Sequence, residues 1–582
     1  MEILRDTLKK AILEFYEIDF EPEIVVAPEN IDADYSSNAP LKLAKILRKN
    51  PMEIAETLTE VFSRSINGDG PFTERPKPVT LAPWDANCRR QTGLRERSEK
   101  IASVSVSPPG FLNFKISDAA LNSMISELNE NFEVKSDKFV GKTVICEFSD
   151  PNPFKVLHVG HLYTSVVGDS ISRLFEYAGA RVIRANFGGD VGLHVAKTIY
   201  ALMQKNLSDF TIEDIARCYI EGTAAYEDDE NAKIEITRLN KEIYKINSEN
   251  IHEGEVAELY WKGRELSYEY FKDFYARLGI KFDKYYPESM VAGLGLAKVQ
   301  EELKKGVYEK SDGAVIFDGE KYGLHTRVFI NKEGVPTYEA KDVGLIFQKY
   351  EDYHFDKSVV ITGSEQLEYM KVVLKSVEQY APELVEKTSH LTHGLVKLPG
   401  NVKMSSRKGN FLKAIDVLKM VKDELKDEYD SEDEKVSLAA TKYAFLKYKI
   451  GGNIVFDPKE SVKMTGNSGP YLLYSAVRAK KILANMKNNK KIENYVYNKY
   501  ERNLAKKLLE YKDLLNEAVI EMAPHKVAGY LYELSQEFSR FYEKCPVVGT
   551  PEESERIKLT RVYLETMVHG LKILNIEVPE EM

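Results

Sequence analysis

The chain has 582 residues, of which 43% are hydrophobic and 30% are charged, and its formal net charge is −10. This length exceeds what one hydrophobic core organises, so several domains are expected. The acidic balance excludes a protein that binds every polyanion through an overall basic surface, and four scattered cysteines exclude a disulfide framework. The absence of long apolar runs and of a signal-peptide pattern predicts a cytoplasmic protein with no membrane segment.

A small α+β domain is predicted for residues 1–120. A helix should restart at Pro51, because Asn50 can cap it and proline fits the first helical position. After a loop-like stretch from Asn67 to Lys100, the segment VSVSPPGFLNFKIS alternates as two strands would around a Pro-Pro-Gly turn.

A second domain is predicted for residues 140–411. KTVICEFS has the pattern of a buried strand, HLYTSVVGDSISRLFEYAGA that of a helix and RVIRANF that of another strand, which together form a βαβ unit with parallel strands. The same alternation returns at KSVVITG. A polar stretch, about residues 199–320, separates the two halves, so the pattern predicts a Rossmann-like sheet split by an insertion.

Helical patterns dominate the rest of the chain, with a stem or linker at residues 412–465 and a bundle at residues 466–582. From Arg478 to Lys512, eleven Lys or Arg stand against three Glu, which predicts a local basic surface. The fold class is therefore multidomain α/β, with a Rossmann-like parallel sheet and its insertion, a small α+β N-terminal domain and an all-α C-terminal bundle.

Two histidines three residues apart, His158 and His161, lie in HVGH, where the first strand gives way to a helix. Packing is the ordinary role of such a pair, and a metal would need further ligands that no nearby Cys or His supplies. However, open α/β sheets bind ligands where a parallel strand ends and a helix begins. The helix N-terminus attracts phosphate, both histidines could donate to phosphate oxygens, and Gly160 would let a flat adenine approach. A nucleotide site gives all three residues a role.

A second motif, VKMSSRKGN, follows the second half of the sheet. A solvated charged turn is its ordinary interpretation, although a basic loop at this place suits the phosphates of ATP. HVGH resembles the HIGH signature of the class I aminoacyl-tRNA synthetases, and VKMSSRKGN is similar to their KMSKS loop, in the same order. The resemblance implies that ATP is bound by His158, Gly160, His161, Lys403, Met404 and Ser405.

Further segments resemble one branch of that class, the arginyl-tRNA synthetases: EFSDPNPFKVLHVGHL, TYEAKDVG, SEQLEYM, APHKVAGYLYELSQEFSRFYEKCPV and, near the start, DYSSNAPLKLAKILRKNP. A guanidinium is planar, permanently charged and carries five donors, so its pocket needs carboxylates and neutral acceptors. The resemblance implies an arginine site made by Glu147, Asn152, Tyr338, Asp342 and Gln366. Each also has an ordinary interpretation; Glu147 could pair with a surface Lys, and Tyr338 could belong to the core.

The sequence departs from the pattern of the family at two places. Ser406 stands where the KMSKS loop has its second Lys, so the catalytic role toward phosphate, beside that of His158 and His161, is assigned to three cations: Lys403, Arg407 and Lys155. Val191 stands where the family has Trp, so packing there should differ.

The resemblance implies ATP-dependent ligation of L-arginine to its tRNA through an arginyl-adenylate, with release of AMP and pyrophosphate. Mg²⁺ should accompany ATP, and no tightly bound protein metal is expected. Residues 1–120 should touch the outer corner of the tRNA, and residues 466–582 should read the anticodon with aromatic surfaces from Tyr471, Tyr474, Tyr530 and Tyr542. A monomer is expected by resemblance.

Two rival functions are kept open. One is a different enzyme with the same nucleotide-binding fold, such as another class I synthetase or a small nucleotidyltransferase. The other is a non-catalytic RNA-binding protein with the synthetase shape. The long helical bundle argues against the small transferase, and the presence of His158, Gly160, His161 and Lys403 argues against the loss of ATP chemistry.

Overall fold

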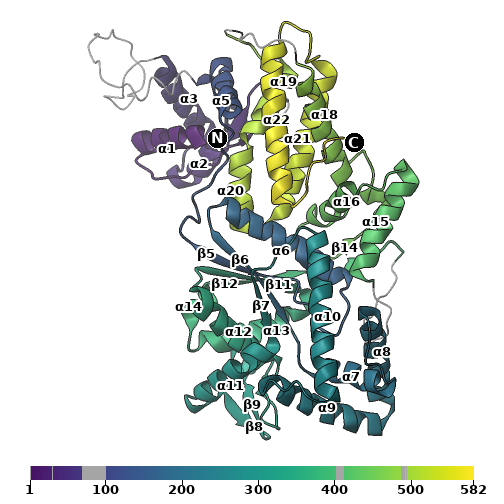
Figure 1. The fold of residues 1–582 in the computed structure, drawn as a ribbon. Coiled ribbons are helices and arrows are strands. Elements are labelled where there is room, and N and C mark those ends of the chain that lie inside the picture. Colours follow the sequence, from purple (N-terminus) through teal and green to yellow (C-terminus); the bar gives the residue numbers. More distant parts are fainter. Residues whose placement is uncertain (1, 29, 68–99, 401–411, 487–491, 493) are drawn as a thin grey trace. The chain divides into compact units, whose positions relative to one another are not determined.

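The computed structural model describes residues 2–28, 30–67, 100–400, 412–486, 492 and 494–582. The chain forms two compact units. The first consists of Met1–Val134, Arg478–Leu514 and Glu533–Met567, and the second of Lys135–Val477, Leu515–Tyr532 and Val568–Met582. Figure 1 labels the elements, and each unit is described by itself.

The first unit contains a four-stranded antiparallel sheet in the order β1-β2-β4-β3. The predicted strand pair is confirmed as β3 and β4, and the predicted cap is confirmed because Met52 N donates to Asn50 Oδ1 at 2.9 Å. The elements that begin the unit are α1 (Glu2–Tyr16), β1 (Val25–Val26), β2 (Tyr35–Ser37), α2 (Ala39–Leu47), α3 (Pro51–Asn67), β3 (Ile101–Ser107), β4 (Phe111–Ile116) and α5 (Asp118–Glu130).

Part of the C-terminal helical region, Arg478–Leu514 and Glu533–Met567, belongs to this same unit. The physical reason is an ion-pair cluster around Arg502 on α19 (Lys499–Leu509). Arg502 Nε donates to Asp34 Oδ1 at 3.0 Å and Arg502 Nη1 to Asp118 Oδ1 at 2.7 Å. Contacts between residues 468 and 384 positions apart cannot be read from local patterns.

The second unit is built on a five-stranded sheet in the order β12-β11-β5-β6-β7, in which every neighbouring pair is parallel. The predicted Rossmann-like sheet is thus confirmed, with the strand order reversing between β5 and β11 (Figure 1). The strands are β5 (Thr143–Glu147), β6 (Arg181–Gly188), β7 (Lys284–Pro287), β11 (Lys357–Gly363) and β12 (Thr388–His393).

Helices pack on this sheet through buried apolar side chains. Ile145 on β5 and Tyr286 on β7 share a core cluster with Leu345 on α12 (Tyr338–Tyr353). α12 also lies very close to α11 (Glu288–Lys304), because a Cβ at Gly344 would be 2.3 Å from the backbone oxygen of Val291. Glycine at this crossing therefore sets the position of α12, which carries two residues of the predicted arginine site.

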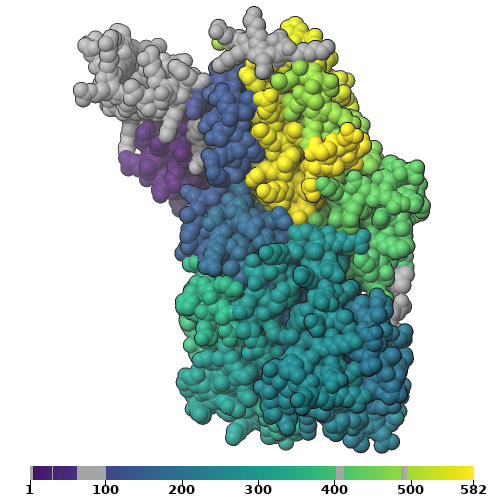
Figure 2. All heavy atoms as spheres, viewed as in Figure 1, coloured from purple at the N-terminus to yellow at the C-terminus, as the bar shows by residue number. Residues whose placement is uncertain are grey.

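The stretch predicted as an insertion, about residues 199–320, is not separate from the sheet throughout. Its central part is helical, but β7 returns to the main sheet and pairs with β6. A small antiparallel sheet then follows in the order β10-β9-β8. The elements are α7 (Leu193–Gln204), α8 (Ile212–Asp228), α9 (Glu230–Ser248), α10 (Glu255–Arg277), β8 (Glu309–Ser311), β9 (Ala314–Phe317), η1 (Gly319–Tyr322) and β10 (Arg327–Ile330). In Figure 2 the teal segments of this stretch form an unbroken surface on the visible face of the second unit.

The remaining elements are mostly helical, as predicted. The division into units passes through four helices, α18 (Gly469–Ala484), α20 (Tyr511–Glu521), α21 (Pro524–Lys544) and α22 (Glu553–Ile573). The others are α6 (Val159–Tyr177), η2 (Ser364–Gln366), α13 (Leu367–Glu378), α14 (Pro382–Glu386), β13 (Val396–Lys397), α15 (Ala414–Tyr429), α16 (Glu434–Leu446), β14 (Ile454–Val455) and α17 (Pro458–Ser461). Among the described residues, no helix is both long and apolar enough to cross a membrane.

Candidate active site

A cavity of about 660 Å³ lies in the second unit, at the carboxyl ends of the central strands. It is bordered by the end of β5, the start of α6, the end of β11 and the first turns of α12 and α13. This is the topological switch point between β5 and β11, where open α/β sheets bind ligands. Eight residues of the predicted site line it: Glu147, Asn152, His158, Gly160, His161, Tyr338, Asp342 and Gln366.

The two histidines cap the N-terminus of α6 reciprocally. Gly160 N donates to His158 Nδ1 and His158 N donates to His161 Nδ1, each at 3.1 Å. The two rings stack with their centroids 3.8 Å apart. Because each Nδ1 accepts a backbone proton, each neutral imidazole carries its own proton on Nε2 and can donate from that atom.

Both histidines are uncharged at neutral pH. Burial, with Lys155 next, lowers the pKa of His158 to about 4. Burial, with His158 next, holds the pKa of His161 well below its usual range. The pair can therefore donate hydrogen bonds to a phosphate without bringing positive charge, which the motif alone does not reveal.

Gly160 has a reason for lacking a side chain that differs from the predicted one. A Cβ at this position would lie 2.8 Å from Cε1 and 2.9 Å from Nδ1 of His158. The ring of His158 thus occupies the space that a side chain would need. The glycine supports the reciprocal cap in the first place, and approach of an adenine at this point stays a prediction.

The loop after β5 places three polar side chains in the pocket. Ser149 and Asp150 both have left-handed backbone conformations, with φ of 75° and 49°, and Asp150 Oδ1 accepts from Phe187 N at 2.8 Å. Asn152 Oδ1 accepts from Gly189 N at 2.8 Å. With its oxygen engaged, Asn152 presents its NH₂ donors to a ligand, which suits an anionic group.

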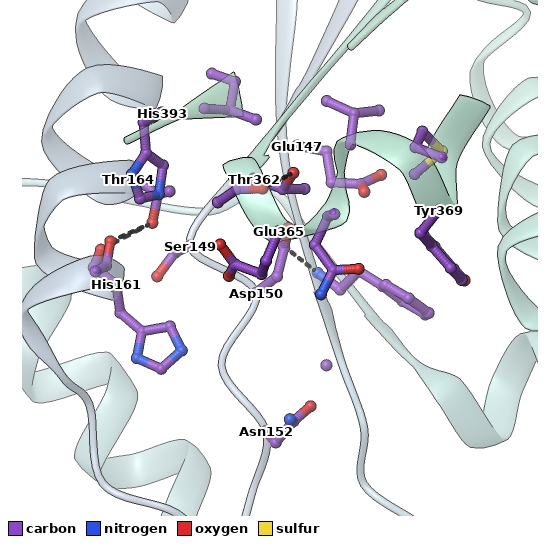
Figure 3. A pocket seen from close by; sticks show the side chains of 18 of the residues that line it. Glu147, Ser149, Asp150, Asn152, His161, Thr164, Thr362, Glu365, Tyr369 and His393 are labelled. Atoms are coloured by element: carbon purple, nitrogen blue, oxygen red, sulfur yellow. Dashed lines mark hydrogen bonds between the residues drawn. The ribbon is translucent and has the colours of Figure 1, made fainter. Parts of the chain in front are cut away.

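Glu147, the last residue of β5, is paired with a lysine that sequence analysis missed. Lys349 Nζ donates to Glu147 Oε2 at 2.6 Å, and the two side chains are 1% and 4% exposed. The ion-pair partner of Glu147 is therefore a buried lysine, and not the surface lysine that the sequence allowed as an alternative. Glu147 nevertheless lines the pocket, with Asp150 and Tyr369 nearby in the same close-up (Figure 3).

Asp342 is the least compensated carboxylate of the predicted site. It lies on α12 one turn after Tyr338, accepts a hydrogen bond from Tyr369 on α13, and is 8% exposed. Burial raises its pKa to about 7, although the Tyr369 hydroxyl opposes this, and Glu147 adds to it. A ligand cation at this point would favour the ionised carboxylate.

His161 and Tyr369 lie on opposite sides of the pocket (Figure 3), so the capped helix and the carboxylates form separate halves.

A second cavity of about 380 Å³ shares His158, His161 and Asn152 with the first. Lys155, Arg217 and Lys413 bring positive charge to its wall, and Lys155 Nζ lies 4.9 Å from the ring centroid of Tyr219.

The residues of the second motif that the sequence analysis names fall outside the described residues: Lys403, Met404, Ser405, Ser406 and Arg407. The chain described after them starts at Leu412, whose carbonyl accepts from Val159 N at 2.9 Å. The described chain that follows the second motif is therefore held directly against HVGH.

Sequence analysis missed Lys349, Asp150 and Tyr369. Asp150 is part of the EFSDPNPF segment, so its position after the strand could have suggested it. Lys349 and Tyr369 lie in ordinary amphipathic helices, and no local signal distinguishes them from surface residues. Within the described ranges, no group of three or more His, Cys, Asp or Glu is arranged to hold a metal ion.

Comparison with known families decides between the rival interpretations of this pocket. The model of the family described as tRNA synthetases class I (R), catalytic domain, matches residues 123–457, more than half of the chain. The chain belongs to the class I arginyl-tRNA synthetases. The arginyl tRNA synthetase N terminal domain matches residues 2–69, and the DALR anticodon binding domain matches residues 472–582.

Individual arginyl-tRNA synthetases agree with this assignment. The chain is 27% identical to the arginine–tRNA ligase of Fusobacterium nucleatum, over 96% of this chain and 95% of that protein. It is 30% identical to that of Borrelia garinii, over 80% of this chain and 85% of that protein. The solved structure of the Thermus thermophilus arginyl-tRNA synthetase is 23% identical, covers 100% of both chains and has a TM-score of 0.78, which confirms the fold.

Membership of the arginyl-tRNA synthetases assigns ATP-dependent ligation of arginine to tRNA. The departure at Val191 has a structural outcome, because its side chain is 1% exposed and packs in a core cluster with Phe154 and Tyr260. A smaller apolar residue is thus accommodated within the core. The boundaries of the four predicted domains stay predictions.

Proposed function

We propose that arginine lies in the carboxylate half of the pocket, between Glu147 and Asp342. Arginine brings two cations, the guanidinium and the α-ammonium, and these two carboxylates offer one partner for each. Which carboxylate takes which cation is left open. Tyr338 and Gln366 supply neutral polar groups at the rim, and the NH₂ of Asn152 donates to the substrate carboxylate. The observation that carries this placement is the burial of Asp342 in the pocket wall, 8% exposed and bound to Tyr369, which raises its pKa to about 7.

ATP occupies the other half of the pocket, against the N-terminus of α6. His158 and His161 donate from Nε2 to phosphate oxygens, and Gly160 keeps the two rings in place. Lys155 takes part in phosphate stabilisation from the second cavity, together with Lys403 and Arg407 from the second motif. Mg²⁺ enters with ATP as part of the substrate, coordinated mainly by phosphate and water.

The reaction then proceeds in two steps. The arginine carboxylate attacks the α-phosphorus of ATP, the bond to the β-phosphate oxygen breaks, and pyrophosphate leaves. The terminal ribose hydroxyl of tRNA next attacks the activated carbonyl and AMP leaves. The protein contributes alignment of the reacting atoms and donors for the developing charge, and no protein nucleophile is needed.

The tRNA is proposed to contact both ends of the chain, residues 1–120 at its outer corner and residues 466–582 at its anticodon. Tyr474 and Tyr542 are 41% and 40% exposed and can stack on bases, whereas Tyr530 is 3% exposed and belongs to the core. Three cations of the predicted basic stretch, Arg502, Lys506 and Lys507, are already engaged in ion pairs. The monomeric state and the cytoplasmic location stay predictions.

The test of the site is charging of tRNA by the purified protein, with each of the twenty amino acids supplied separately. Arginine alone should be charged. His161→Ala should lower kcat with ATP because it removes an Nε2 donor, whereas His252→Ala, exposed and outside the pocket, should leave kcat unchanged. Equal effects of the two substitutions would contradict the proposed role of the pair.

A further inference from the structure

Lys349 joins the two elements that carry the carboxylates of the arginine half. It lies on α12, the helix of Asp342, and its Nζ donates to Glu147 Oε2 at 2.6 Å and to Ser358 Oγ at 3.3 Å. Glu147 ends β5 and Ser358 lies on β11. The lysine therefore ties α12 to both strands at the switch point of the sheet.

Holding the helix on the sheet does not by itself require a lysine. Transfer of two charges from water is costly, and a buried ion pair is often no more stabilising than apolar residues of similar volume. α12 is already held by the apolar cluster around Ile145 and Leu345 and by its close crossing with α11. The charge of Lys349 thus calls for a reason connected with Glu147 itself.

That reason lies in the concentration of acids around Glu147. Asp342 faces it from α12, Asp150 from the loop after β5 and Tyr286 from β7. Burial, with the Glu147 charge next, holds the pKa of Asp150 well above its usual range. A buried carboxylate in such surroundings is unfavourable unless a cation is in contact with it. Lys349 supplies that contact, and it acts on Asp150 and Asp342 as well.

We propose that Lys349 is a positioning residue for arginine recognition, which binds Oε2 of Glu147 and holds its side chain in place, so that Oε1 is presented to a substrate cation at a fixed distance from Asp342. The proposal rests on the placement of arginine between these two carboxylates. Because one helix carries both Lys349 and Asp342, the spacing of the two anionic sites is rigid, which favours a substrate whose two cations match it.

The decisive variant is Lys349→Met, which keeps the length of the side chain and removes its charge. The KM for arginine should rise about 10- to 100-fold, the loss of one charge-assisted hydrogen bond, while the KM for ATP stays within about twofold. Because the Lys349 charge lowers the pKa of Asp342, its loss should shift the pH dependence of the KM for arginine to higher pH. Lys349→Arg should retain most of the affinity.

Lys442→Met is the matched control. Lys442 is also a buried lysine of the second unit, 6% exposed, but it donates to the Asn575 carbonyl and does not line the pocket. Its removal should leave the KM for arginine and the pH profile unchanged. A shared change in both variants would indicate a general consequence of losing a buried lysine, which would contradict the proposal.

A double-mutant cycle separates positioning from folding. If Lys349 acts through Glu147, the variant Glu147→Gln/Lys349→Met should have the KM of Glu147→Gln within about twofold. This pair of variants decides the matter even where Lys349→Met alone does not fold, because the double variant removes both partners of the buried ion pair and leaves neither Glu147 nor Lys349 as an unpaired charge. The proposal is overturned if the second substitution adds a further tenfold, or if folded Lys349→Met keeps the wild-type KM and pH profile. A wild-type protein that does not charge arginine would instead refute the proposed function.

Discussion

Two buried groups of charges, one in each unit, differ in whether their carboxylates are paired with cations. In the first unit, Asp34 is 2% exposed and accepts from Arg502 Nε at 3.0 Å and from Ile116 N at 2.7 Å, with Lys506 3.5 Å away. In the second unit, Asp342 is 8% exposed and accepts from Tyr369, and within the described ranges no cation is in ion-pair distance of it.

The difference distinguishes a structural contact from a binding site. The Arg502 cluster is complete within the chain, so its charges are satisfied as soon as the protein folds. In the carboxylate half of the pocket, burial raises the pKa of Asp342 to about 7, with Glu147 and Glu288 adding to it, and among the described residues no cation is paired with Asp342. An arginine substrate would supply what is absent. Each prediction below alters one of these two groups.

The largest expected effect is on stability, in the first unit. Arg502→Met removes the cation between Asp34 and Asp118 and leaves both carboxylates and the Ile116 carbonyl without their donor. Breaking a buried pair by removing one partner costs about 3–5 kcal/mol. Urea unfolding followed by circular dichroism should show a first transition at lower urea, while the KM for arginine stays constant. A changed KM with an unchanged transition would remove the contrast between the two groups.

The next effect is on activity, in the second unit. Asp342→Asn keeps the shape of the side chain and removes the charge that arginine needs, so kcat/KM for arginine should fall about 100-fold, which corresponds to about 2.7 kcal/mol. Stability should be unchanged or higher, because an ionised Asp342 is unfavourable in the empty pocket. Aminoacylation kinetics and thermal melting of the same sample test both parts. A variant that is both inactive and unstable would place Asp342 with the structural charges.

The half of the site that local pattern encodes could be predicted from sequence. HVGH lies at a strand-to-helix junction, and Tyr338 and Asp342 share a helix face, so the motif and the helical period locate these residues without knowledge of tertiary contacts. The parallel sheet followed in the same way from alternating strands and helices. The exception is β7, whose four residues carry no signal that separates them from the insertion.

Partnerships between distant residues could not be predicted. Lys349 is 202 positions from Glu147, and Arg502 is 468 positions from Asp34, so neither pair leaves a trace in spacing or periodicity. The same limit applies to the histidines, since the motif identifies them but not the reciprocal cap that sets their tautomer. The balance of charges in a buried site depends on contacts between residues far apart in the sequence, which local patterns do not show.

A smaller effect should appear in the pH dependence of arginine binding. Below pH 7 Asp342 in the empty pocket is protonated, and binding a cation there requires loss of that proton, so the KM for arginine should rise up to about tenfold per pH unit as the pH falls. The folded empty protein also holds this proton between about pH 4 and 7, where the unfolded chain has released it. This carboxylate therefore makes the empty protein less stable as the pH rises through that window.

Initial rates from pH 5.5 to 8.5, at saturating ATP, measure this dependence. Other charged groups near Asp342 are Glu147, Glu288, Lys349 and the Tyr369 hydroxyl, so the comparison is best made against Asp342→Asn, whose KM should not follow the same profile. A wild-type KM that is flat across this range would mean that Asp342 is ionised before arginine arrives, and the pocket would then resemble the completed cluster of the first unit.

The smallest effect concerns the edge of that completed cluster. Lys506 lies 3.5 Å from Asp34, but Arg502 already binds both oxygens of this carboxylate, so Lys506→Met should cost only about 1 kcal/mol. The measurement is the same urea transition as for Arg502→Met. If loss of Lys506 were as costly as loss of Arg502, Asp34 would need both cations, and the first unit would depend on each of its charges as the pocket does, where Lys349 is in contact with Glu147 and acts on Asp150 and Asp342 as well. A small effect instead shows that a structural cluster tolerates removal of an outer charge because its carboxylate keeps an adequate set of donors.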